Sequence, residues 1–172
     1  MEQTGEEFFH DFRQELLAGA EANGRFQLDE FMETIAAELV ETGFTEGFEL
    51  CHFRAQRGVR VDGYWFNDEG VLHLFIADFE SRNELVSLTK TDVDAAFKRV
   101  ANFFDASIDR NLADDLEVTS PEYGLARQIG DRRGPLAHRQ GHKTKIEANQ
   151  SITNFSNLTR NSPFLYFGLS QK

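Results

Sequence analysis

Cysteine is almost absent from this chain, and long apolar runs are missing. The single cysteine, Cys51, excludes an internal disulfide framework and a cysteine-rich zinc site, and its apolar neighbours favour a small buried side chain. No apolar run reaches the roughly 18 residues that a membrane span needs, and the acidic N-terminus lacks the apolar segment of a signal peptide. We therefore expect a cytoplasmic protein that does not enter a membrane.

Positive charge is also scarce. The chain has 18 Lys and Arg against 29 Asp and Glu, a net charge of −11. A protein that binds nucleic acid through a broad basic field has the opposite balance. If nucleic acid is a ligand, we expect weak binding by this chain alone and the help of a downstream region or a partner subunit.

Apolar residues are plentiful enough for one well-filled domain. They make up 40% of the 172 residues, and 17 are Phe. Apolar periodicity and turn residues predict helices over about 6–22, 29–42, 92–107 and from Ser120 to about 132, and strands over about 48–54, 59–66 and 71–79. Thr91 and Asp94 are expected to form a capping box at the third helix. The expected fold is α+β, an antiparallel three-stranded meander flanked by helices.

Three acids lie at the ends of two strand-like runs. Asp62 belongs to the second predicted strand, and Asp78 and Glu80 end the third, on the same face as Leu72, Leu74 and Ile76. Carboxylates in such a group are typical ligands of Mg²⁺ or Mn²⁺, and the metal can activate water and stabilise a phosphodiester leaving group. The alternative is that these acids are solvated strand ends. His52 and His73 have no second histidine at ligand spacing, so we expect them to pack or to face solvent.

Four segments of the chain carry a family resemblance: Arg57–Tyr64, Leu72–Phe79, Ala95–Val100 and Ser120–Tyr123. Through them the residues from about Phe26 to Gly134 resemble the N-terminal domain of the abortive-infection phage resistance (AIPR) family. The acid pattern also resembles the PD-(D/E)xK nuclease core. The resemblance implies an αβββα-type, restriction-endonuclease-like core and a role in bacterial anti-phage defence.

The resemblance also assigns roles to side chains. Asp62 and Asp78 would hold the metal, Glu80 would assist or position water, and Glu38 on the second helix could complete the ligand set. Glu80 stands where the nuclease motif has Lys, so Lys98 on the following helix is a candidate substitute. Each of the two helical residues has a simpler interpretation as a solvated side chain.

The last part of the chain differs in composition, which suggests three regions: 1–24, an N-terminal helix; 25–136, the AIPR-like domain; and 137–172, a polar tail. The tail carries five Lys and Arg against one acid, whereas residues 1–136 carry 13 against 28. We expect either a truncated or frame-shifted product with a foreign tail, or a small variant whose tail supplies the last strand.

Three functions remain open from the sequence. The first is a metal-dependent nuclease acting on phage or host nucleic acid. The second is a catalytically silent interaction or regulatory module of a defence system, which the missing lysine and the acidity favour. The third is an inactive fragment.

Overall fold

The computed structural model describes residues 4–56, 58–77, 79 and 88–131, and the strands at 147–149 and 168–170. The elements in chain order are α1 Gly5–Asn23, α2 Gln27–Glu41, β1 Glu49–Ala55, β2 Val59–Phe66, β3 Leu72–Phe75, α3 Lys90–Asp109, the 3₁₀ helix η1 Leu112–Asp115, α4 Pro121–Asp131, β4 Glu147–Asn149 and β5 Gly168–Ser170. The predicted order of two helices, three strands and two further α-helices is confirmed.

Local signals in the sequence define the helix ends. Thr4 and Glu7 form a capping box at the start of α1, and Gly24 ends that helix in the left-handed conformation with φ of 64°. The Ser120 hydroxyl accepts a hydrogen bond from the Tyr123 N–H at 3.3 Å, and α4 begins at Pro121 as predicted.

The capping box predicted for α3 is wrong by two residues. Thr89 is the N-cap, its hydroxyl accepts from the Asp92 N–H, and the Asp92 carboxylate accepts from the Thr89 N–H. Thr91 and Asp94 therefore lie inside α3, which begins at Lys90. The sequence repeats the Thr-x-x-Asp spacing two residues apart, so the pattern alone did not select the correct pair.

The three main strands form an antiparallel sheet in the order β1-β2-β3. The β2–β3 hairpin closes through Asn67, whose side chain accepts from the Val71 N–H at 2.8 Å, and through Gly70 with φ of 78°. Strand β3 is shorter than predicted, because its last pair with β2 joins Phe75 to Gly63. The α+β class, with two helices before the sheet and two after it, is confirmed.

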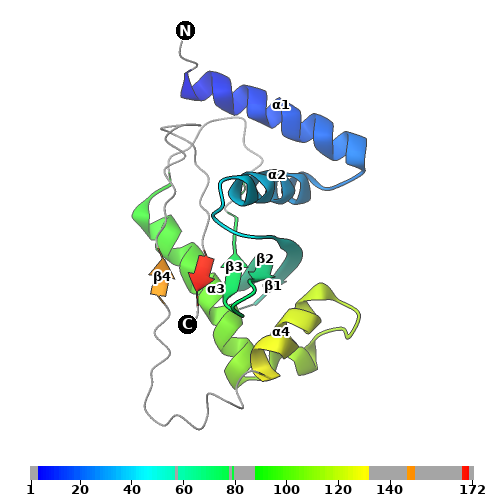
Figure 1. The fold of residues 1–172 in the computed structure, drawn as a ribbon, viewed down its shortest axis with the longest axis vertical. Coiled ribbons are helices and arrows are strands. Elements are labelled where there is room, and N and C mark those ends of the chain that lie inside the picture. The colour runs from blue at the N-terminus through cyan, green and yellow to red at the C-terminus, as the bar shows by residue number, and fades with distance from the viewer. Residues whose placement is uncertain are drawn as a thin grey trace.

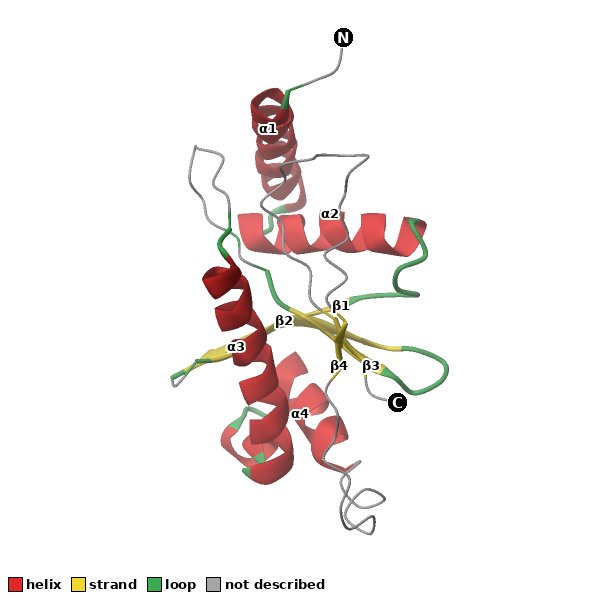
Figure 2. Cartoon of the chain, turned by 90° about the vertical axis from the view of Figure 1, so that its left-hand side faces the viewer, coloured by secondary structure: helices red, strands yellow, loops and turns green. Residues whose placement is uncertain are grey.

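Helices cover both faces of the sheet, so β3 is buried on both sides (Figures 1 and 2). Leu72, Leu74 and Ile76 belong to the core beneath α3 and α4, as the shared-face prediction requires. Phe75 and Ala77 belong to a second core with α1 and α2. The alternation continues past the end of β3, which is why the sequence made the strand look longer.

The last two strands, β4 and β5, pair antiparallel with each other, and β5 lies close to β3. Among the helices of the described residues, none has both the length and the apolar character needed to cross a membrane.

Candidate functional site

A buried carboxylate lies in the middle strand of the sheet. The Asp62 side chain belongs to β2, and the residue is only 3% exposed. Opposite it, the register between β1 and β2 shifts, because two residues of β1, Cys51 and His52, lie between the pairs Leu50–Gly63 and Phe53–Val61. Such a bulge redirects a side chain, and here His52 lies beside Asp62.

Arg60 neutralises this carboxylate from two residues earlier on the same strand. Its Nε donates to Asp62 Oδ1 at 3.0 Å, and its Nη2 is 2.9 Å from Oδ2. Residues at i and i+2 of a strand share a face, and a guanidinium matches two carboxylate oxygens. Arg60 is itself only 6% exposed, so the two charges form a buried, bidentate ion pair.

Arg60 and Asp62 also form hydrogen bonds with the backbone of Ala77, just beyond the end of β3. The Ala77 N–H donates to Asp62 Oδ2 at 2.8 Å, and Arg60 Nη2 donates to the Ala77 carbonyl at 2.8 Å. Both polar groups of the Ala77 backbone are therefore bonded to β2 side chains. These contacts continue the β2–β3 connection after the backbone pairing has ended.

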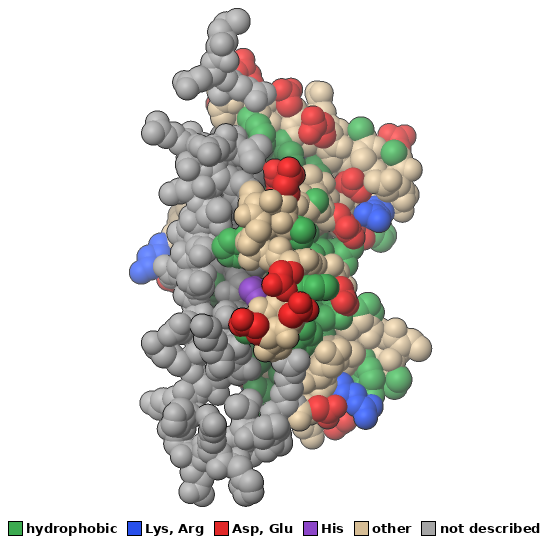
Figure 3. All heavy atoms as spheres, viewed as in Figure 1, with side chains coloured by type: hydrophobic (Ala, Val, Ile, Leu, Met, Phe, Trp, Pro, Cys, Tyr) green, Lys and Arg blue, Asp and Glu red, His purple; other side chains and the backbone are tan. Residues whose placement is uncertain are grey.

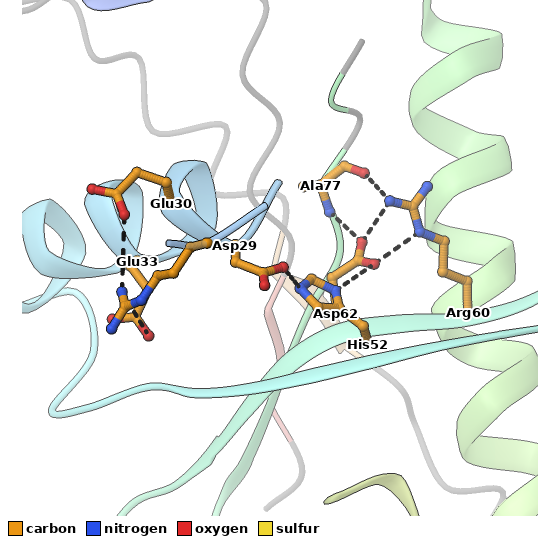
Figure 4. A network of polar contacts seen from close by, with 8 residues as sticks. Asp29, Glu30, Glu33, His52, Arg60, Asp62 and Ala77 are labelled. Atoms are coloured by element: carbon orange, nitrogen blue, oxygen red, sulfur yellow. Dashed lines mark hydrogen bonds and ion pairs between the residues drawn. The ribbon is translucent and has the colours of Figure 1, made fainter. Parts of the chain in front are cut away.

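His52 connects this cluster to α2. Its Nε2 is 2.8 Å from Asp29 Oδ1, and its Nδ1 is 3.6 Å from Asp62 Oδ1. Figure 4 shows the resulting line of contacts from Asp29 through His52 to Asp62, with Arg60 and Ala77 beyond. Because each ring nitrogen faces a carboxylate, which only accepts hydrogen bonds, the geometry favours the doubly protonated imidazolium.

The electrostatics follow from these contacts. The polar contact with Asp62 raises the pKa of His52, and the charges of Asp62 and Asp29 add to this effect against the opposing effect of burial. Burial alone would raise the pKa of Asp62, but the contacts with His52, Arg60 and the Ala77 N–H together lower it below its ordinary value. Asp62 is therefore ionised at neutral pH.

The structure brings only part of the predicted site together. Asp78 and Glu80 lie outside the described residues, although the neighbouring Ala77 contacts Asp62 directly. Glu38 is half-buried on α2, and it lies nine residues after Asp29, about 13 Å farther along the helix axis. Asp29, rather than Glu38, is the acid of α2 that connects to the Asp62 cluster.

Lys98 also stands apart from the cluster. It is exposed on α3, about 200° around the helix from the buried Ala96. Lys98 therefore occupies the face of α3 opposite to the one that packs on the sheet.

Sequence reasoning missed three members of the cluster: Asp29, His52 and Arg60. His52 is exposed, as one of the two sequence expectations has it, and its ring nitrogens also face the carboxylates of Asp29 and Asp62. The spacing of Arg60 and Asp62 on one strand was a readable signal for their pairing. No feature of the sequence indicates the bulge in β1 or the packing of α2 beside His52.

Asp62 is part of a buried ion pair in this cluster. Within the part of the chain that the structure describes, no group of three or more His, Cys, Asp or Glu side chains could hold a metal ion. Asp62, the one predicted ligand that is both described and in the cluster, already contacts Arg60, His52 and Ala77.

These features define an α+β domain with a sheet between two helical layers and a buried charge cluster on its central strand. Residues 31–140 match the family model of the abortive infection phage resistance protein N-terminal domain. The chain therefore belongs to this family. No curated protein and no solved structure matches the chain significantly.

Proposed function

We propose that this domain serves phage defence as a catalytically silent interaction module, in which the acid of the nuclease-like motif has become a structural anchor. The observation that carries the proposal is the pairing of the buried Asp62 with Arg60 and the Ala77 backbone. The function shown by the family is that of a domain of an abortive infection phage resistance protein, and the silent role is our refinement of it.

The donors that face the two oxygens of the Asp62 carboxylate can be counted. A carboxylate offers about four lone-pair positions. Asp62 Oδ1 faces Arg60 Nε and His52 Nδ1, and Oδ2 faces Arg60 Nη2 and the Ala77 N–H. Three of these donors lie within 3.0 Å and the fourth, His52 Nδ1, lies at 3.6 Å. A metal would therefore compete with buried partners for most of this carboxylate, which is costly.

The charge of the surface supports a protein partner over a nucleic acid. Helices α1 and α2 carry ten Asp and Glu against one Arg. Figure 3 shows acidic side chains distributed over the described part of one face, with Lys and Arg in few places. Such a surface repels a phosphate backbone. A partner subunit, or a further region of a longer defence protein, fits it better.

A metal-dependent nuclease is the second candidate, and one contact favours it. The bond from the Ala77 N–H to Asp62 Oδ2, at 2.8 Å, puts Asp62 next to the residue that precedes Asp78. The PD-(D/E)xK resemblance requires Asp62 and Asp78 to lie near each other, and the Ala77 contact supports that requirement. In this candidate Asp62, Asp78 and Glu80 would hold Mg²⁺ or Mn²⁺, which would supply charge stabilisation at a phosphodiester.

In that second candidate the helical residues keep their proposed roles. Glu38 would complete the ligand set, and Lys98 would offset phosphate charge in place of the motif lysine. Both side chains would have to approach the cluster from their positions on α2 and α3.

Two measurements on the purified chain separate the candidates. The first incubates single- and double-stranded DNA and RNA with the protein in EDTA, Mg²⁺ or Mn²⁺, beside Asp78→Asn. The second compares thermal melts in EDTA and Mn²⁺. A silent module gives no cleavage above that of the variant and no metal-dependent rise in Tm.

The exposed hairpin acid Asp68 provides the matched control, because Asp68→Asn makes the same chemical change away from the cluster. Cleavage that Asp78→Asn abolishes and Asp68→Asn retains would overturn the silent role and establish the nuclease.

A further inference from the structure

One nitrogen of Arg60 lies between two buried oxygens. Nη2 is 2.9 Å from Asp62 Oδ2 and 2.8 Å from the Ala77 carbonyl oxygen. A carboxylate and a backbone carbonyl are the oxygen ligands that hard divalent cations use in proteins. The guanidinium therefore occupies a position that is chemically suited to a cation.

We propose that the guanidinium of Arg60 is a built-in cation that fills a latent divalent-cation site formed by Asp62 and the Ala77 carbonyl, and that removing this side chain opens the site. The inference rests on the proposed function in one respect, that Asp62 is a structural anchor in the native chain. It adds the chemical class of ligand that the anchor would accept, a hard divalent cation such as Mn²⁺ or Ca²⁺.

The native chain should exclude such a cation because Arg60 is tethered. Attachment to β2 gives the guanidinium a high effective concentration at Asp62, and its two contacts with that carboxylate are made together. A cation that displaced it would leave a positive charge buried without a partner. Millimolar free metal should therefore have no measurable effect on the native protein.

Removing Arg60 takes a positively charged donor away from both the Asp62 carboxylate and the Ala77 carbonyl oxygen. In Arg60→Ala, Asp62 keeps His52 and the Ala77 N–H but loses its main counter-charge, and the Ala77 carbonyl loses the Nη2 donor. The space vacated by the long side chain can admit a cation with several of its waters. With only two protein oxygens, the affinity should be weak, with Kd on the order of 10⁻³ M.

The test compares thermal melts of the whole chain in EDTA and in millimolar Mn²⁺ or Ca²⁺. We expect Arg60→Ala to have a lower Tm than the native chain in EDTA. The divalent cation should raise that Tm by about 2–4 °C, which corresponds to free metal several times above Kd. The native chain should not respond.

Three variants make the result specific to this position. Arg54→Ala is the matched control, because Arg54 pairs with Arg60 across β1 and β2 but is exposed, and it should not respond to metal. Arg60→Lys keeps a positive charge and should respond less than Arg60→Ala. The double variant Arg60→Ala/Asp62→Asn should lose the response.

The outcomes are separable from those of the proposed function. An Arg60→Ala chain that metal does not stabilise, or that fails to melt cooperatively with or without metal, overturns the latent site and leaves the silent role standing. If metal stabilises the native chain and Asp62→Asn removes that effect, both the latent site and the silent role are overturned. Equal stabilisation of Arg54→Ala and Arg60→Ala would show binding elsewhere on the acidic surface and would also overturn the inference.

Discussion

The substitution Asp62→Asn tests the buried ion pair most directly. It preserves the shape of the side chain and removes its negative charge, so Arg60 is left with a buried charge that nothing in the cluster balances equally well. The change also removes the acceptor that Ala77 uses, if the new amide group turns its NH₂ toward that backbone N–H.

The magnitude follows from the burial of both partners. Asp62 is 3% exposed and Arg60 is 6% exposed, so water cannot readily replace the lost partner. Removing one member of a buried ion pair costs about 3–5 kcal/mol, and the remaining amide oxygen puts Asp62→Asn near 3 kcal/mol. For a chain of this size that loss lowers Tm by roughly 6–12 °C.

Urea unfolding at pH 7, followed by far-UV circular dichroism, measures the free energy of unfolding. Asp68→Asn, at the exposed tip of the β2–β3 hairpin, is the control and should change it by less than about 0.5 kcal/mol. The double variant Arg60→Met/Asp62→Leu should be less destabilised than the sum of its single changes, because it removes both charges.

The reasoning would be refuted by an Asp62→Asn protein that loses less than about 1 kcal/mol with an unchanged denaturant slope. Such a small loss is typical of a solvated pair. Additive single changes in the double variant would contradict the coupling of Arg60 with Asp62.

Three further outcomes are expected. Because the pKa of His52 is raised in the folded state, its contribution to stability is complete below about pH 6.5 and is lost as the pH rises through the folded-state pKa. Urea unfolding across that range should show a falling free energy of unfolding. His52→Gln should reduce this pH dependence. A methyl group at Gly63 would overlap the Phe48 ring, so Gly63→Ala should cost about 1–3 kcal/mol in the same assay. Thr89→Ala should cost about 1 kcal/mol through loss of the α3 cap, whereas Thr91→Ala should leave that cap intact, so equal losses would contradict the assigned capping box.

The element order was readable because local signals agreed with the apolar pattern. Two apolar, strand-like runs with a turn at Gly70 between them predicted the hairpin, and Gly24 marked the end of the first helix. These features depend on residues close together in the chain, where backbone geometry and capping chemistry decide the outcome.

The end of β3 could not be predicted by the same means. The side chains of Ile76 and Ala77 continue the alternation, and both are buried, so the sequence gives no sign of a strand end at Phe75. Ladder pairing ends there because Asp62 and Arg60 bond the Ala77 backbone with their side chains. Strand length was therefore decided by contacts between β2 and the chain 15 to 17 residues later.

The candidate site divides in a similar way. Asp62 was found because it ends an apolar, strand-like run and belongs to the acid pattern that resembles the nuclease motif. The pairing with Arg60 is local and was missed, while the contacts of His52 with Asp62 and Asp29 depend on a bulge and on helix packing. No pattern within a single helix or strand specifies these contacts, so only the assembled fold brings His52, Asp62 and Asp29 together.

A buried carboxylate can be balanced by a metal ion or by a cation that the protein carries itself. The nuclease motif that the acid pattern resembles uses metal and a lysine, and in that resemblance Glu80 stands at the lysine position. Arg60 brings a positive charge to the cluster from β2, two residues before Asp62, and bonds that carboxylate with two nitrogens. The cluster therefore has its counter-charge without metal. The same ion pair anchors Ala77 to β2, because Asp62 accepts from the Ala77 N–H and Arg60 donates to the Ala77 carbonyl.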